Sequence, residues 1–213
     1  SKKVFYRRKE GRELDTAVSI VVDESGSMAG VPEENVRQLA VVLGETLNKI
    51  GVPFEIVGST THTDSDHGEV PDGFTRWVPV WYRIYKSFDE GWANVRHRVS
   101  YISSLGCNVD GEVIETMAYR IAKRKESRKV ILSLSDGQPN AGERIGYYQT
   151  SPVIGKHLVN TCERVRKSGV EVYGFGIGTM EPQKYYGADY FVYLKSVADM
   201  GADFFRSFAE IVT

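Results

Sequence analysis

The chain has 213 residues and a formal charge of −1, from 27 basic and 28 acidic side chains. An α/β domain of this length can bury a substantial core, and the balanced charge argues against a nucleic-acid surface or an acidic disordered tail. No apolar run approaches the roughly 20 residues of a membrane-spanning helix, so we expect a soluble, cytoplasmic protein that binds neither nucleic acid nor membrane.

We interpret residues 1–213 as one domain in which residues 1–15 form a basic lead-in. Short apolar runs rich in β-branched residues predict buried strands, and these lie at residues 17–22, 54–58, 129–134, 170–175 and 191–194. Apolar positions at helical spacing predict helices, and these lie at residues 32–50, 92–102, 112–122, 154–167 and 197–211. Residues 60–76 are expected to be a polar loop, and residues 77–88 an extended or hairpin segment.

The alternation of strands and helices predicts an α/β fold of Rossmann-like type. Right-handed crossovers would give a mainly parallel sheet with helices on both faces. Ligands of such open sheets bind outside the carboxyl ends of the strands. The candidate site should therefore be sought in the loops that follow the predicted strands.

Three loops at predicted strand ends carry oxygen ligands. In chain order they hold Asp23, Ser25 and Ser27, then Asn108 and Asp110, and finally Asp136. Carboxylate and hydroxyl oxygens are hard ligands, which suit Mg²⁺ or Mn²⁺ better than Zn²⁺. Because two of the ligands are neutral hydroxyls, the cation would keep positive charge for one more carboxylate. We therefore expect a metal site that accepts an acidic side chain of a partner protein.

The ordinary interpretation of an Asp-x-Ser-x-Ser sequence is a polar turn. The metal interpretation is favoured by its context, since the motif follows a buried strand and precedes a helix. A second buried strand, at residues 129–134, also ends in Ser-Asp-Gly at residues 135–137.

Other features have simpler interpretations. Residues 61–69 contain two histidines and three acids but lack the full pattern of a calcium loop, so a solvated loop is favoured over a second metal site. The glycines within residues 174–178 lack the spacing and context of a dinucleotide fold. Cys107 and Cys162 lack zinc or C-x-x-C spacing, which favours free, packed thiols over a nucleophile. The aromatic residues at positions 77–85 are expected to form a half-buried hairpin, with a partner surface as the alternative.

Residues 18–28 resemble the first metal-site loop of von Willebrand A (VWA) domains, and residues 131–139 resemble the third. Within that superfamily the chain resembles the C-terminal domain of the CobT-type subunit of aerobic cobaltochelatase. The segments that carry this resemblance occur in family order, at residues 84–87 with Trp92, 108–112, 135–139, 174–178 and 185–186.

The resemblance implies a MIDAS metal site in which Ser25 and Ser27 contact the metal directly. It also implies that Asp23 and Asp136 act either directly or through water. Most VWA domains carry a threonine in the second loop, where this chain has Asn108, with Asp110 two residues later. The CobT-type group shares this departure, and the resemblance leaves open which of the two contacts the metal.

The function that this resemblance implies is a non-catalytic interaction module. It would work with an AAA+ ATPase of CobS or MoxR type in the insertion of cobalt during cobalamin biosynthesis. ATP hydrolysis would belong to the partner, because the chain has no P-loop sequence. One alternative is a freestanding CobT-like adaptor with another client. A second is a Mg²⁺-dependent hydrolase or phosphoryl-transfer enzyme using Asp23, although Ser25 stands where such enzymes need a second aspartate.

Overall fold

The computed structural model describes residues 15–61, 79–137, 139–140 and 147–213. These residues form a six-stranded sheet in the order β3-β2-β1-β4-β5-β6. β3 is antiparallel to β2, and every other neighbouring pair is parallel. The strands are β1 (Thr16–Asp23), β2 (Phe54–Thr61), β3 (Val80–Lys86), β4 (Arg128–Ser135), β5 (Val170–Ile177) and β6 (Phe191–Leu194).

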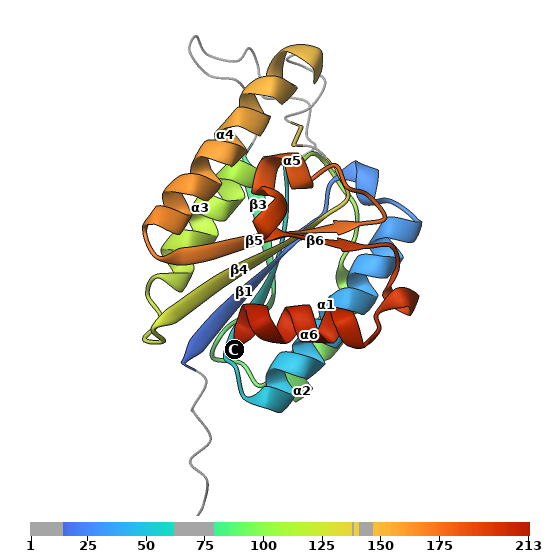
Figure 1. Cartoon of the computed structure of the whole chain (residues 1–213). Coiled ribbons are helices and arrows are strands. Elements are labelled where there is room, and N and C mark those ends of the chain that lie inside the picture. The colour runs from blue at the N-terminus through green and yellow to red at the C-terminus, as the bar shows by residue number, and fades with distance from the viewer. Residues whose placement is uncertain (1–14, 62–78, 138, 141–146) are drawn as a thin grey trace, which may run out of the picture.

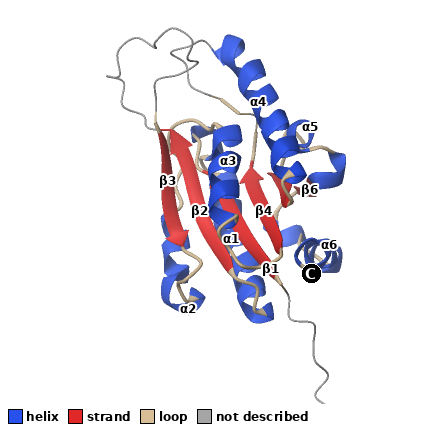
Figure 2. Ribbon diagram, turned by 90° about the vertical axis from the view of Figure 1, so that its left-hand side faces the viewer, coloured by secondary structure: helices blue, strands red, loops and turns tan. Residues whose placement is uncertain are grey.

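Helices cover both faces of this sheet (Figure 1). α1 and α6 lie on one face, and α3 and α4 lie on the other. The α-helices are α1 (Val31–Ile50), α2 (Trp92–Val95), α3 (Asp110–Ile121), α4 (Tyr147–Lys167), α5 (Gln183–Tyr186) and α6 (Ala202–Val212). The predicted α/β fold class is therefore confirmed, and Figure 2 shows the strands running side by side between helices.

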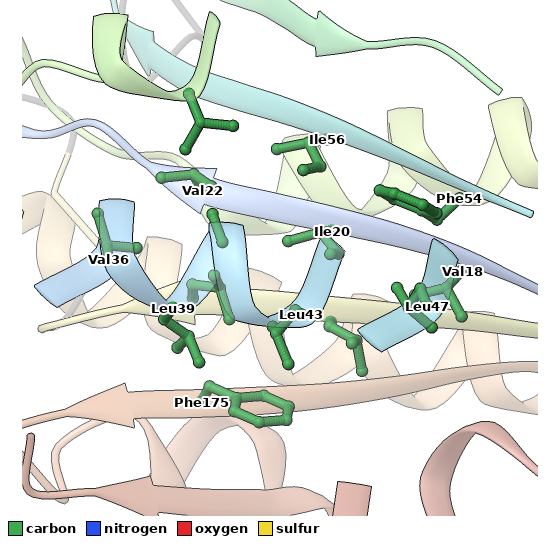
Figure 3. Close-up of a cluster of buried hydrophobic side chains, with 14 of the residues drawn as sticks. Val18, Ile20, Val22, Val36, Leu39, Leu43, Leu47, Phe54, Ile56 and Phe175 are labelled. Carbon is green, nitrogen blue, oxygen red and sulfur yellow. The ribbon is translucent and has the colours of Figure 1, made fainter. Parts of the chain in front are cut away.

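The core is built on β1, whose eight residues are all buried. Alternate residues of a strand point to opposite faces of the sheet, so Ile20 packs towards α1 while Val21 packs towards α3. Leu39 and Leu43 of α1 fill the first of these layers (Figure 3). Burial on both faces explains why the strand is an unbroken apolar run.

Two segments predicted as continuous helices are interrupted in the structure. The helix expected over residues 92–102 is the single turn α2 followed by a 3-10 helix, Arg96–Tyr101. The helix expected over residues 197–211 is a 3-10 turn, Val197–Asp199, and then α6, with the extended residue Gly201 between them.

The extended alternative predicted for residues 77–88 is confirmed at the edge of the sheet. Within the described residues this segment is the strand β3, which pairs antiparallel with β2 across a register shift between Ile56 and Val57. The shift leaves Tyr85 buried and Trp81 half-exposed, so the aromatic residues there form no single surface. Trp77 and the lead-in residues 1–14 lie outside the described residues.

Among the residues that the structure describes, no helix has the length and apolar character needed to cross a membrane.

The predicted helix at residues 154–167 begins earlier, at Tyr147, and includes Pro152.

An ion pair with a buried carboxylate joins β2 to α3. The Glu55 side chain is fully buried, accepts a hydrogen bond of 2.8 Å from Ser19 Oγ, and lies 2.6 Å from Arg120 Nη2. Removing the guanidinium would leave a buried carboxylate without its counter-charge. We therefore predict that Arg120→Ala lowers the free energy of unfolding by about 2 to 4 kcal/mol, measured by urea denaturation.

The matched control is Arg96→Ala. Arg96 pairs with Glu45 at 3.1 Å, but both side chains are largely exposed, and such pairs contribute about 0 to 1 kcal/mol. Equal losses in the two variants would contradict the role given to the buried pair.

Neither Cys107 nor Cys162 forms a disulfide bond among the described residues. Cys162 is fully buried between α4 and the sheet, and burial raises the pKa of its thiol to about 12. We predict that denatured, non-reduced protein titrates two thiols, while in the native protein Cys162 stays unreactive towards a thiol reagent because it is buried and protonated. In Cys107→Ser, the native protein should then show no fast-reacting thiol. A disulfide, or labelling of Cys162 before unfolding, would refute this prediction.

Candidate functional site

The first loop of the candidate site begins where β1 ends. Asp23 is buried, and its Oδ1 accepts a hydrogen bond of 2.8 Å from the backbone N–H of Ser25. Gly26 N–H donates to Gly106 O at 2.8 Å, and a Cβ atom on Gly26 would come within 3.0 Å of Leu105 O. The close approach of the second loop therefore leaves little room for a side chain at residue 26, and the turn presents the Ser25 and Ser27 hydroxyls 3.0 Å apart.

The second loop contributes Asn108, which is buried between two carboxylates. Its Oδ1 accepts the backbone N–H of Asn140 at 3.1 Å. Because a backbone N–H can only donate, this contact fixes the orientation of the amide. The Asn108 Nδ2 group then donates to Asp23 Oδ2 at 3.0 Å and to Asp110 Oδ2 at 3.4 Å. Asn108 thus ties the first and second loops together through a donor.

The third loop follows β4. Val22 and Leu134 are paired in the parallel register of β1 and β4, so the two strands end side by side. Ser135 Oγ donates to Asp23 Oδ2 at 2.8 Å, and Ser27 Oγ donates to Asp136 Oδ1 at 3.0 Å. All six residues expected at the site are therefore brought together by one hydrogen-bonded network.

The spacing of three oxygens fits a small hard cation. Ser25 Oγ, Ser27 Oγ and Asp136 Oδ1 follow one another at 3.0 Å and 3.0 Å. Mg²⁺ binds six oxygens at 2.0–2.1 Å, which separates neighbouring ligands by about 2.9 Å. Each of the two separations therefore matches that of neighbouring ligands of such a cation.

The crowding of carboxylates at the site also favours a bound cation. Burial raises the pKa of Asp23, and burial together with the charges of Asp23 and Asp136 raises the pKa of Asp110. The pKa of Asp136 is also raised by burial. Crowded carboxylates of this kind are stabilised in their ionised form by a cation. Among the described residues no group of three His, Cys, Asp or Glu side chains could hold a metal ion, so a metal here would have to take serine hydroxyls among its ligands.

The roles within the network are unequal. Both oxygens of Asp23 already accept hydrogen bonds, from Ser25 on one side and from Asn108 and Ser135 on the other. This arrangement suits an indirect role for Asp23, through water. Ser27 is exposed, whereas Ser25 is buried, so the site opens to solvent at Ser27.

Sequence reasoning missed two contributors. Ser135 could have been found, because it ends β4 beside Asp23 in the parallel register. Glu24 left no local signal: it is an acidic residue in a polar loop, yet it is buried against Arg83 and Tyr85 of the distant strand β3.

The other features have structural roles or lie outside the described residues. The backbone of Cys107 pairs with Thr61, since Cys107 N–H donates to Thr61 Oγ1 at 2.8 Å. A Cβ atom on Gly174 would come within 2.3 Å of the Tyr186 ring, so this glycine is explained by packing. The histidine-rich residues 62–69 lie outside the described residues.

Solved structures with the same fold are VWA domains at low sequence identity. The von Willebrand factor domain of a type V pili tip protein from Porphyromonas gingivalis has a TM-score of 0.65 at 10% identity, covering 92% of this chain and 94% of that one. Proximal thread matrix protein 1 from the mussel byssus, solved with a zinc-occupied MIDAS motif, has a TM-score of 0.58 at 16% identity, covering 92% and 44%. These likenesses establish the fold.

A curated relative gives less information about function. The uncharacterized protein YojO of Bacillus subtilis is 30% identical over 175 residues, which are 80% of this chain and 25% of that protein. The chain thus spans a quarter of the length of that relative. The family model described as the VWA domain of the cobalamin biosynthesis protein CobT matches residues 4–213, and the chain therefore belongs to this family of CobT-type VWA domains.

Proposed function

We propose that the domain is a non-catalytic binding module that uses a divalent cation, Mg²⁺ or Mn²⁺, to bind a carboxylate of a partner protein. The observation that carries this proposal is the row of oxygens from Ser25, Ser27 and Asp136 at 3.0 Å spacing, beside buried carboxylates. Exposure of Ser27 leaves the row accessible to a partner. A cation there would act as a Lewis acid that binds the incoming acidic side chain.

The comparisons support a divalent metal in this fold. The mussel thread protein holds zinc at its MIDAS motif. In the present chain the donor set consists of hydroxyl and carboxylate oxygens, which favour Mg²⁺ or Mn²⁺. Asn108 and Asp110 would complete the negative surroundings of the cation, with Asp110 as the charged member of the pair.

The proposed partner is an AAA+ ATPase of CobS or MoxR type, together with a client protein that supplies the acidic residue. Membership of the CobT-type family makes cobalt insertion in cobalamin biosynthesis, in the cytoplasm, the first setting to test. A freestanding adaptor with another client would use the same site, and the identity of the co-purifying ATPase separates the two.

The geometry favours binding over phosphoryl transfer. An aspartate nucleophile needs a free oxygen, whereas both oxygens of Asp23 are engaged by donors from three residues. A phosphatase assay with Mg²⁺ tests this alternative directly, and turnover that is lost in Asp23→Ala would favour the enzyme.

Metal binding should appear as thermal stabilisation. At ten times its Kd, Mg²⁺ should stabilise the folded state by about 1.4 kcal/mol, which raises Tm by about 3 to 5 °C for a domain of this size. Asp23→Ala should lose most of this shift, because the loop that presents the hydroxyls is held by the Asp23 carboxylate. The control is Asp89→Ala, whose carboxylate is 95% exposed and should leave the shift unchanged. Equal shifts in wild type and Asp23→Ala would rule out the assigned site.

Partner binding should depend on the two hydroxyls. The double variant Ser25→Ala with Ser27→Ala should remain folded, because strand-end loop residues contribute little to the core, yet it should lose metal-dependent binding to the AAA+ ring. A chelator should reproduce the loss in wild type. Binding is measured by calorimetry alongside a melting curve, with the exposed α6 variant Ser207→Ala as control. Undiminished binding by a folded double variant would place the docking surface elsewhere.

A further inference from the structure

We propose that the buried Glu24–Arg83 ion pair positions the candidate metal site, by fixing the segment at residues 103–107 against the loop that carries Ser25 and Ser27. Neither side chain belongs to the expected ligand set. The inference rests on the proposed function, since the property that the pair sets is the affinity of the site for its cation.

The Glu24 side chain turns away from the metal site and lies across β2. A Cβ atom on Gly58 would come within 2.4 Å of the Glu24 carboxyl carbon, so only glycine leaves room for it. The side chain is fully buried, with Arg83 Nε donating to Oε2 at 2.8 Å and the Tyr85 hydroxyl donating to Oε1. A charged group in this place is costly unless it is fully paired, which makes an alternative geometry unfavourable.

Arg83 passes this constraint to the second loop. Its Nη1 and Nη2 groups donate to Ser103 Oγ at 2.9 Å and to Ser103 O at 2.8 Å. The backbone of Glu24 holds the same segment, because its carbonyl accepts Leu105 N–H at 2.7 Å. Glu24 therefore contacts the second loop in two ways: its side chain acts through Arg83, and its backbone carbonyl binds Leu105 directly.

The segment at residues 103–107 is bonded to the serine loop and is followed by Asn108. Gly106 O accepts Gly26 N–H at 2.8 Å, in the middle of the serine loop. Two residues later, Asn108 donates to Asp23. Ser104, which lies between Ser103 and Leu105, donates its backbone N–H to Glu33 of α1 at 2.6 Å. Release of the Arg83 contact would let the segment shift relative to Gly26 and Asn108, and with it the spacing of the oxygens.

The protein contains a matched ion pair that lacks this connection. Glu55, like Glu24, has a fully buried side chain on or beside a strand. Its partner Arg120 is 36% exposed, close to the 30% of Arg83. Glu55, however, contacts Ser19 and α3, none of which belongs to the candidate site. Comparing variants of the two ion pairs therefore distinguishes a loss of stability from a loss of metal affinity at the site.

The experiment compares Glu24→Gln with Glu55→Gln in the whole chain. Mg²⁺ affinity is measured by titration calorimetry well below the melting temperatures, and Tm is recorded for each variant. Both variants should lower Tm, because each leaves an arginine without its carboxylate. Only Glu24→Gln should weaken Mg²⁺ binding, by about tenfold, as for residues that support metal ligands. Glu55→Gln should stay within about twofold of wild type, since distant sites act independently.

A second pair of variants keeps the test possible if the glutamine variants fail to fold. Arg83→Lys keeps the positive charge beside Glu24 but loses the planar fork that reaches Ser103, and it should also weaken Mg²⁺ binding. Arg120→Lys is its control. Unchanged Mg²⁺ affinity in folded Glu24→Gln and Arg83→Lys, or equal weakening in the Glu55 and Arg120 variants, would overturn the inference alone. A wild-type protein that binds no Mg²⁺ would overturn the proposed function as well.

Discussion

The parallel register of β1 and β4 places the last residues of two central strands side by side, and the candidate site depends on this placement. Val22 lies opposite Leu134, so Asp23 emerges beside Ser135 and Asp136. The strands themselves are fixed by burial on both faces, which leaves their carboxyl ends no freedom to slide. A shift of one residue would turn every core side chain to the wrong face. The same interactions that stabilise the core therefore align the oxygens of the site.

The carboxylates of the site differ from two that pair with arginine elsewhere in the protein in how their charge is compensated. Glu126 and Glu171 have arginine partners that lower their pKa. At the site, burial raises the pKa of Asp23, Asp110 and Asp136, and each of them accepts a hydrogen bond from a hydroxyl or amide group. Neutral donors orient a carboxylate without cancelling its charge. A divalent cation would supply the missing charge, and its remaining coordination position would be free for a partner.

The loops around the site are fixed by contacts from both sides of the sheet edge. Asn108 joins the first and second loops through its amide, while Glu24 joins them through Arg83. Cys107 anchors the same segment to β2. A frame of this kind keeps neutral hydroxyls in place without a bound ligand, which lowers the entropy lost when a cation binds. Rigid support of this kind would suit the binding role proposed for the site.

The sequence by itself determined the α/β class, the central strands, the three loops of the site and the likeness to CobT-type VWA domains. The strands and the first and third loops follow from local patterns, since burial on both faces produces apolar runs and strand ends produce polar loops. The second loop was predicted at a strand end but follows the 3-10 helix Arg96–Tyr101. Only the tertiary structure decided that β3 is an antiparallel edge strand and that two predicted helices are broken. It also decided the donor role of Asn108, the contact of Ser135 with Asp23 across 112 residues of sequence, and the burial of Glu24. The physical reason is that these features arise from contacts between distant segments, which leave no periodic trace in the sequence around each residue.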